Sequence, residues 1–133
     1  LTLDLIKQDW LDCLNQLRLT DLTVEDAKKI FYRFNQDIFV GLWGYGDKII
    51  CSATLLLEHK FIHKGGLVGH IEDVVVREDF RGHGYGKELV QYLIDYCKEQ
   101  GAYKCILDCG LHNIGFYESL GFTNSEIHMR IDL

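Results

Sequence analysis

The sequence contains no proline, and it shows no internal repeat, low-complexity tract or polar linker. Segments of those kinds usually separate domains, so their absence leaves no obvious boundary. A chain of 133 residues, 47% of them hydrophobic, is long enough for one α/β core and short for two ordinary domains. We therefore expect residues 1–133 to form a single domain.

Positive charge and long apolar runs are also scarce. Lysine and arginine number 14 against 20 acidic residues, which gives a formal charge of −6, and no basic run occurs. This balance argues against nucleic acid or an anionic membrane as a partner. No apolar stretch reaches transmembrane length and there is no signal peptide, so we expect a cytoplasmic protein. Because the sequence begins with Leu1 rather than methionine, we expect a short segment to precede it.

Cysteine is present but lacks the spacing of a metal site or of a disulfide framework. The five cysteines are an odd number without zinc-ligand spacing, and several fall in apolar strand or helix patterns. Free cysteine usually behaves as a small buried hydrophobe. We predict reduced, buried thiols, and no metal, at Cys13, Cys51, Cys97, Cys105 and Cys109.

Hydrophobic periodicity predicts a mixed α/β domain. Apolar residues at helical spacing indicate helices, and alternating or β-branched runs indicate strands. Helices are expected over residues 4–17, 23–34, 87–100 and 112–120, and strands over 38–43, 49–58, 68–77, 104–108 and 127–131. Two helices, an antiparallel meander, a βαβα unit and a closing strand give a mixed, mostly antiparallel sheet flanked by helices.

The most informative segment is 74–89, in which a β-branched strand is followed by Arg81-Gly82-His83-Gly84-Tyr85-Gly86 and an amphipathic helix. Alternate glycines expose consecutive backbone N–H groups, and the helix adds unpaired amides and the positive end of its dipole. The segment lacks both the Gly-Lys-Ser/Thr of a P-loop and the spacing of a dinucleotide fingerprint. It therefore indicates a phosphate or pyrophosphate site, or else a glycine-rich turn without a ligand.

Several segments carry a resemblance to one enzyme family. Arg81-x-x-Gly84-x-Gly86 resembles the acyl-CoA pyrophosphate loop of the GNAT N-acetyltransferase superfamily. Three further regions resemble one family within that superfamily, the glucosamine-6-phosphate N-acetyltransferases. They are His70-Ile71-Glu72-Asp73-Val74-Val75-Val76, then Ile106-Leu107-Asp108-Cys109 with Asn113-Ile114-Gly115-Phe116-Tyr117-Glu118, and Leu57-Glu58-His59-Lys60-Phe61-Ile62-His63. The resemblance implies the GNAT fold, acetyl-CoA as donor, and a homodimer with shared active sites.

The resemblance also assigns the acetyl-CoA site. Amides of the glycine loop would hold the pyrophosphate, and the backbone of the preceding valines would pair with the pantetheine arm as an added strand. The valine side chains would meanwhile pack in the core. The residues expected at the donor are Val74, Val75, Val76, Arg81, Gly82, His83, Gly84, Tyr85, Gly86, Asn113, Phe116 and Tyr117.

Glu72 and Asp73 are adjacent carboxylates in an otherwise apolar strand. Successive strand residues face opposite sides, so both acids can serve one pocket only if the strand is bulged. The resemblance implies such a splay, with the acidic pair at the sugar and the acetyl group, and with the free N–H of Val74 as oxyanion donor. The alternative is a salt bridge to a lysine or arginine on a neighbouring strand.

Asp108 and Tyr117 are candidates for the proton steps. Asp108 follows a predicted strand, where catalytic groups of open α/β sheets tend to lie, and the resemblance places it near the sugar's amino group. Tyr117 has a phenol suited to protonating the leaving thiolate, and Asn113 lies on the same helix face. The resemblance implies that Tyr117 does this and that Asn113 binds the pantetheine. The alternatives are a helix N-cap for Asp108 and a core aromatic for Tyr117.

A sugar phosphate needs cations, and the candidates are Lys60, His63, Lys104 and Arg130. Each alone would usually be a solvated surface charge. Two positions depart from the family pattern. This chain has Leu17-Arg18 where the family has a Leu-Thr pair, and Asp132 where the family has an arginine. Arg130 lies on the same strand face as Asp132 and could supply the missing cation. The full set expected at the acceptor is Lys60, Phe61, Ile62, His63, Glu72, Asp73, Tyr103, Lys104, Asp108 and Arg130.

We therefore predict an enzyme that acetylates glucosamine 6-phosphate by direct attack in a ternary complex, a step toward UDP-N-acetylglucosamine. Catalysis is assigned to Glu72, Val74, Asp108 and Tyr117. Two alternatives stay open: a GNAT enzyme acting on another small amine or a protein amino group, and an acyl-CoA-binding sensor without turnover. A sensor should lack the Asp108 and Tyr117 constellation, which this chain has.

Overall fold

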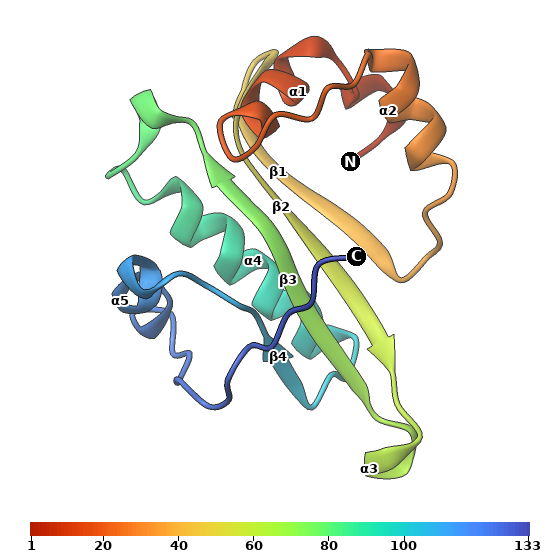
Figure 1. Cartoon of the computed structure of the whole chain (residues 1–133), viewed down its shortest axis with the longest axis vertical. Helices are drawn as coiled ribbons and strands as arrows, with labels where there is room; N and C mark the ends of the chain where they lie inside the picture. Colours follow the sequence, from red (N-terminus) through yellow and green to blue (C-terminus); the bar gives the residue numbers. More distant parts are fainter.

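The computed structural model describes residues 1–133 and is built around one four-stranded sheet (Figure 1). The strands are β1 (Ile38–Tyr45), β2 (Lys48–His59), β3 (Leu67–Val76) and β4 (Lys104–Ile106), side by side in that order. β1 and β2 pair antiparallel, as do β2 and β3, whereas β3 and β4 pair parallel. The predicted mixed, mostly antiparallel sheet is confirmed.

The helices surround this sheet, and most begin near the predicted residues. They are η1 (Leu3–Leu5), α1 (Gln8–Asn15), α2 (Val24–Phe31), α3 (Ile62–Gly65), η2 (Glu78–Phe80), α4 (Tyr85–Glu99), η3 (Leu111–Asn113) and α5 (Ile114–Glu118). α2 starts with a capping box, because Thr23 Oγ1 accepts from the Asp26 N–H at 3.1 Å while the Asp26 carboxylate accepts from the Thr23 N–H at 3.2 Å. The first predicted helix is wrong in its start, since a 3₁₀ turn precedes α1.

Alternation along β2 directs side chains to two apolar clusters. One cluster gathers α4, the odd-numbered residues of β2 and Tyr117 of α5. The other gathers α1, α2 and residues Val40, Ile49 and Val75 of the sheet, and there the Trp10 indole donates to Ser52 Oγ at 3.1 Å. α1 and α2 lie at one end of the sheet, with α3 at the other (Figure 1). Part of the sheet face that carries α1 is not covered by a helix, and this uncovered part includes the half-buried Thr54 and the exposed Glu72.

The C-terminal segment differs from the prediction. The strand expected over 127–131 does not form, and residues 123–133 contain no helix or strand. A strand needs a hydrogen-bonded neighbour, and no backbone hydrogen bond joins this segment to the sheet. The fourth strand also ends at Ile106 rather than Asp108, because β4 pairs with β3 over only three residues.

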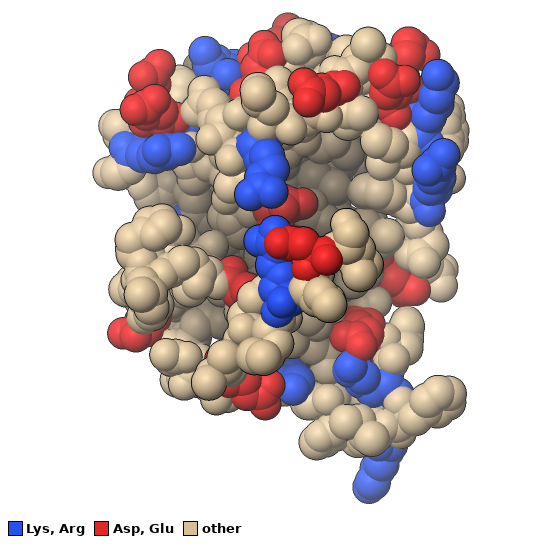
Figure 2. Space-filling view, viewed as in Figure 1, with Lys and Arg blue, Asp and Glu red and all other residues tan.

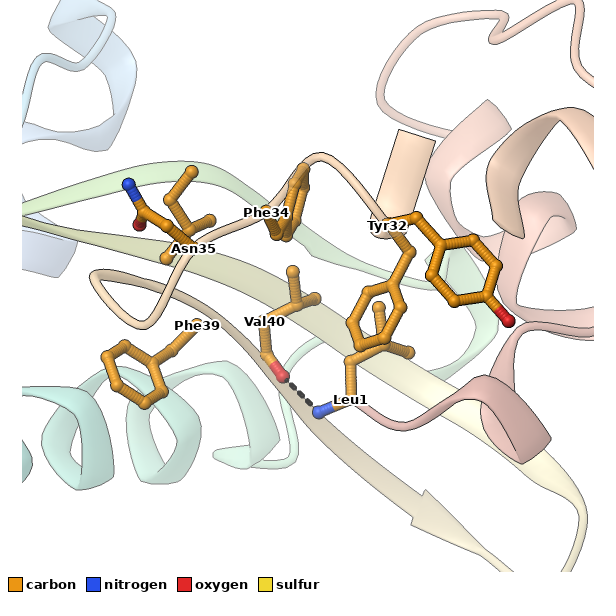
Figure 3. A pocket seen from close by; sticks show the side chains of 8 residues that line it. Leu1, Tyr32, Phe34, Asn35, Phe39 and Val40 are labelled. Carbon is orange, nitrogen blue, oxygen red and sulfur yellow. Dashed lines mark hydrogen bonds between the residues drawn. The ribbon is translucent and has the colours of Figure 1, made fainter. Parts of the chain in front are cut away.

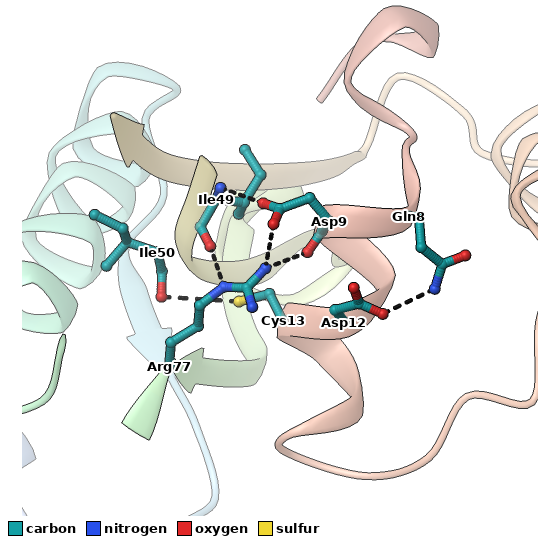
Figure 4. A network of polar contacts seen from close by, with 7 residues as sticks. All are labelled: Gln8, Asp9, Asp12, Cys13, Ile49, Ile50 and Arg77. Carbon is teal, nitrogen blue, oxygen red and sulfur yellow. Dashed lines mark hydrogen bonds and ion pairs between the residues drawn. The ribbon is translucent and has the colours of Figure 1, made fainter. Parts of the chain in front are cut away.

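A buried ion pair ties α1 to the end of β3 (Figure 4). Arg77 follows β3 directly and is 9% exposed. Its Nη2 lies 2.8 Å from Asp9 Oδ1 and its Nε donates to the Ile49 carbonyl at 2.6 Å. Asp9 Oδ2 accepts from the Ile49 N–H at 2.6 Å, so the carboxylate is satisfied on both sides. The network joins α1, the β1–β2 hairpin and the strand that leads to the glycine loop.

Replacing Arg77 by alanine is expected to lower the free energy of unfolding by about 3 kcal/mol, because it removes a buried guanidinium that bonds the Ile49 and Asp9 carbonyls and leaves the partly buried Asp9 carboxylate without its cation. Urea unfolding measures this change. Lys98→Ala is the control, since it removes an exposed pair with Asp95 at 3.7 Å and should cost less than about 0.5 kcal/mol. Similar losses in both variants would contradict the structural role of the network.

The cysteines are all free thiols. Burial is confirmed for Cys13, Cys51 and Cys97, and it raises the pKa of the Cys51 thiol to about 12. Cys105 is only half-buried, and the prediction is wrong for Cys109, which is exposed because it lies in open coil after β4. None of the helices combines the length and apolar character that crossing a membrane requires.

Candidate active site

β3 is bulged where the acidic pair lies. The ladder with β2 resumes at Val75 after Glu72, so Asp73 and Val74 together stand opposite the single residue Ala53. Asp73 adopts a left-handed conformation with φ +52°, which is uncommon for a residue other than glycine. The bulge turns two consecutive residues out of the regular alternation. The predicted splay is therefore present in the chain.

The bulge leaves polar groups open to a ligand. Val74 has no register partner in the ladder with β2, and β4 does not extend this far along β3. Glu72 and Asp73 are exposed, and neither forms a salt bridge with lysine or arginine. The nearest cationic candidate is His70, whose Nδ1 lies 4.0 Å from Glu72 Oε1. The salt-bridge alternative for the acidic pair is therefore wrong.

The second half of β3 has a free edge. β4 pairs only with Val68–His70, so residues 71–76 have no strand on that side. Val75 is buried in the cluster under α1, and Val76 packs against the other cluster. The valine side chains therefore belong to the core, while no strand covers their backbone edge and Arg81 Nε bonds the Val76 carbonyl. An extended arm of a ligand could add to this edge by backbone hydrogen bonds.

The glycine loop follows β3 after the short 3₁₀ helix η2. Gly82 and Gly84 have φ of +79° and +86°, and Gly84 is the N-cap of α4. Glu88 donates the first intrahelical bond, to the Gly84 carbonyl at 3.0 Å. The N–H groups of the three residues between them have no partner within the helix, and α4 is 15 residues long. The arrangement is that of a backbone anion site at a helix N-terminus.

The side chains of the glycine loop contact neighbouring backbone and aromatic groups and do not occupy the space over the loop. Arg81 Nε donates to the Val76 carbonyl at 3.0 Å, and His83 Nδ1 lies 2.9 Å from the Arg81 carbonyl oxygen. The Tyr85 ring packs on Trp43 with centroids 4.3 Å apart. A Cβ at Gly82 or at the N-cap glycine would meet no atom within 4 Å. The space over the loop is therefore open.

Replacing Gly84 by alanine is expected to raise the KM for acetyl-CoA by about 10-fold, since the methyl group would crowd the pyrophosphate and strain the backbone by roughly 1–2 kcal/mol. Steady-state kinetics with each substrate varied in turn measures this. Gly101→Ala is a matched control, because Gly101 has φ +82° and equally open surroundings at the other end of α4. Gly86 is less suitable, since its Cβ would lie 2.7 Å from Val76 Cγ2. Equal changes in both substrates' KM would contradict the assignment.

Tyr117 occupies a boundary between the core and this open region. Its ring is 8% exposed and meets Phe116 and Phe122 edge-on, with centroids 4.9 and 5.9 Å apart. Its hydroxyl makes no hydrogen bond within the chain, yet no fully buried polar side-chain atom lacks a partner. The oxygen must therefore reach accessible space. Burial, and secondarily Cys109, raise the pKa of the phenol, which keeps it protonated at neutral pH.

Neighbours of Tyr117 connect it to the donor site. Asn113 is the residue before α5, four positions ahead of the tyrosine, as expected. A Cβ at Gly86 would lie 3.7 Å from Phe116 Cζ, which places this ring beside the N-terminus of α4. The structure thus brings the glycine loop and α5 together, as the predicted donor site requires.

Asp108 lies two residues beyond β4 and is not a helix cap. The residues before η3 and α5 are Gly110 and Asn113, so the N-cap alternative is wrong. Asp108 Oδ2 instead lies 3.0 Å from Nδ1 of His128, in the C-terminal segment. Both side chains remain half-exposed. The carboxylate is accessible to a ligand on its other side.

The expected phosphate-binding side chains are brought together only in part. His63 stacks on Tyr103 with centroids 4.1 Å apart, and Lys104 Nζ lies 5.8 Å from the centre of that ring. Lys60 is paired with Glu58, and this contact lowers the pKa of the Glu58 carboxyl. His63 and its neighbour Lys64 have positive φ, in the tip that also exposes Phe61 and Ile62. The lobe that carries α3 shows basic side chains in Figure 2.

Arg130 does not join that group within the chain. Its Nε donates to Asp132 Oδ1 at 2.6 Å, and both side chains are exposed. The two residues share a side of the extended segment, as expected from their spacing. Their pairing means that the arginine would have to exchange partners to meet a phosphate.

Two hollows of the surface lie away from all of these residues. One, of about 320 Å³, lies against β1 and is lined by mostly apolar side chains together with Leu1, whose N-terminus donates to the Val40 carbonyl at 2.8 Å (Figure 3). Another, of about 310 Å³, continues along the same strand toward Tyr92 and Tyr96 of α4. Neither contains a carboxylate, histidine or basic side chain. The candidate site is instead the open region between β3, α5 and the glycine loop.

The comparison with known families agrees with this geometry. The model of the Acetyltransferase (GNAT) family matches residues 3–122. Because the match covers most of the sequence, the chain belongs to the GNAT acetyltransferase family.

Individual relatives show which members of the family this chain is similar to. The chain is 48% identical over 82 residues to the glucosamine 6-phosphate N-acetyltransferase of Arabidopsis thaliana, an alignment covering 62% of this chain and 55% of that protein. It is 34% identical over 141 aligned positions to glucosamine 6-phosphate N-acetyltransferase 1 of Dictyostelium discoideum, covering 100% of this chain and 88% of that one. The alignment with the Trypanosoma brucei brucei protein of the same name also spans little more than half of it, 58%.

A solved structure shows the same fold. The crystal structure of glucosamine-6-phosphate N-acetyltransferase from Arabidopsis thaliana matches with a TM-score of 0.93 and 35% identity, over 99% of this chain and 94% of that one. The GNAT fold inferred from the motifs is confirmed, and so is the resemblance to this family.

Two residues that the motifs did not single out have defined places near the site. Arg77 anchors the turn before the glycine loop, and its only signal was a charge directly after an apolar strand. His128 contacts Asp108, and nothing in its local sequence indicates this, because the contact joins segments 20 positions apart.

Proposed function

We propose that this chain transfers the acetyl group of acetyl-CoA to the amine of glucosamine 6-phosphate, giving N-acetylglucosamine 6-phosphate and CoA. The observation that carries the proposal is the bulge at Asp73 and Val74, on the same strand that leads into the open glycine loop. Donor and acceptor groups therefore meet along one strand. The likeness to relatives named glucosamine 6-phosphate N-acetyltransferase supports the choice of acceptor.

The donor site fits a CoA thioester. Acetyl-CoA would supply the acetyl group and a thiolate leaving group. Backbone N–H groups from Arg81 to Lys87 would donate hydrogen bonds to the pyrophosphate oxygens, and the free edge of β3 would pair with the pantetheine arm. Phe116 would form a wall of this groove beside the loop.

The chemistry requires three groups of the chain. Asp108 accepts an N–H of the amine and aims its lone pair at the carbonyl carbon, where the new C–N bond forms. The Val74 N–H donates to the carbonyl oxygen as negative charge develops on it. As the C–S bond breaks, the nitrogen loses one proton to solvent past Asp108, and Tyr117 gives its own proton to the thiolate sulfur and is reprotonated from solvent. The amine needs little help, since an α-amino-like pKa near ~8 leaves part of it neutral at pH 7.

We further propose that the acceptor site is shared by two subunits of a homodimer. The odd-numbered residues of the C-terminal segment expose their apolar side chains: Ile127 87%, Met129 85%, Ile131 82% and Leu133 115%. Such a segment lacks only a neighbouring strand to become one. The cations near α3 lie at the beginning of β3 and the acidic pair about four residues further along, roughly 13 Å away. This separation suits a site completed by a second copy.

The proposal extends to the domain and its setting. Both apolar clusters share β2, which supports one cooperative domain over residues 1–133. Five free thiols suit a reducing compartment such as the cytoplasm. The product would feed the synthesis of UDP-N-acetylglucosamine.

A thiol-release assay over a panel of amines tests the activity. Glucosamine 6-phosphate, glucosamine, polyamines and peptides with free amino groups are offered with acetyl-CoA, and release of free CoA is followed. Rapid release with glucosamine 6-phosphate alone is expected. If another amine is preferred, that amine is the acceptor in place of glucosamine 6-phosphate. If the chain binds acetyl-CoA but no amine causes release of free CoA, the result favours an acyl-CoA-binding sensor.

A further inference from the structure

His128 is the one residue of the C-terminal segment that makes a polar contact with the body of the chain. Its Nδ1 lies 3.0 Å from Asp108 Oδ2, whereas Arg130 pairs within the segment, with Asp132. Residues 123–133 make no backbone hydrogen bond to the sheet. The polar contact between the segment and the rest of the chain is therefore made at Asp108, the carboxylate proposed to bind the amine of the substrate.

The chemistry of this contact has a direction. An ionised carboxylate can only accept, so a hydrogen bond formed at this 3.0 Å contact is one that His128 donates from Nδ1, either as imidazolium or as the neutral tautomer that carries hydrogen on Nδ1. Asp108 makes no other ion pair, and it lies in coil beyond β4 with its side chain half-exposed. Without the histidine, nothing in the chain would hold the carboxylate in one rotamer.

We propose that His128 is a positioning residue, which fixes the Asp108 carboxylate so that Oδ1 faces the incoming amine. The inference rests on the proposed function, and it assigns no proton transfer to the imidazole. Cys109 is next to Asp108 in the chain, and Arg130 and Asp132 on the segment pair with each other. Asp108 is the group that an ion pair joins to the imidazole.

Removing the donor should slow the chemical step. His128→Ala is expected to lower kcat by about 10-fold, the lower end for losing a hydrogen bond to a charged group, and to leave the KM for acetyl-CoA unchanged. His128→Asn should restore most of the loss, because its amide N–H can occupy the position of Nδ1. Glu126→Ala, an exposed change in the same segment with no partner, is the control and should keep the wild-type rate.

Two further measurements separate positioning from general stability. In an Asp108→Ala background, adding His128→Ala should cost nothing more, because the effect passes through the carboxylate. An equal loss in both backgrounds, or failure of His128→Asn to restore activity, would overturn the inference.

Nitrogen NMR of the imidazole tests the contact without any turnover. In the wild-type protein the neutral ring should carry its hydrogen on Nδ1, and in Asp108→Ala this preference should disappear. Hydrogen on Nε2 in the wild type would overturn the inference whatever the kinetics show. Absence of acetylation with every amine would instead count against the proposed function, while the NMR result would still decide whether His128 holds Asp108.

Discussion

Replacing Tyr117 by phenylalanine is expected to lower kcat by about 10²-fold, with little change in the KM for acetyl-CoA. The phenol is needed only when the thiolate leaves, so its loss affects the transition state and not the bound ground state. The ring itself stays in place, because it packs edge-on against Phe116 and Phe122. Because burial raises the pKa of the phenol, it should remain an acid above its ordinary value near ~10.

Tyr96→Phe is the matched control for this experiment. Tyr96 is also partly buried against an aromatic ring, Phe39, with centroids 4.7 Å apart, but it lies on α4 away from the proposed site. Its hydroxyl should be dispensable for turnover. Wild-type kcat in Tyr117→Phe at every pH would remove Tyr117 from the mechanism, and equal losses in both variants would point to packing.

Glucosamine 6-phosphate is expected to exceed glucosamine in kcat/KM by at least about 10²-fold. Each charge-assisted contact to the phosphate contributes roughly 1.5–3 kcal/mol, and two such contacts suffice for this ratio. Lys104→Ala should reduce the preference by about 10-fold, since it removes one contact, and should leave the slow reaction of glucosamine nearly unchanged. Arg130→Ala should act in the same direction, if less, because Arg130 must first leave Asp132.

The control for the phosphate experiment is Lys29→Ala on α2. Lys29 pairs with Asp26 at 3.7 Å, at the opposite end of the sheet from α3, so it tests the loss of one positive charge alone. Its preference for the phosphorylated sugar should equal that of the wild type. Similar kcat/KM values for the two sugars in the wild type would instead exclude the sugar phosphate as the selected substrate.

Local sequence alone determined much of the donor site. A strand, alternate glycines and a helix in direct succession leave little freedom, because φ near +80° at Gly82 and Gly84 and the unpaired amides of α4 follow from residues adjacent in the chain. The capping box at Thr23 and the hairpin of β1 and β2 are equally local. These elements appear within a few residues of their predicted bounds for that reason.

Only the tertiary structure decided how the acceptor side is arranged. The bulge at Asp73 depends on the register between β2 and β3, and the free edge of β3 depends on how soon β4 ends. The strand expected over 127–131 has the right alternation but finds no partner within the chain, and His128 reaches Asp108 across 20 positions. Alternation sets which side chains share a face, whereas pairing and contact between distant segments depend on the folded chain bringing them together.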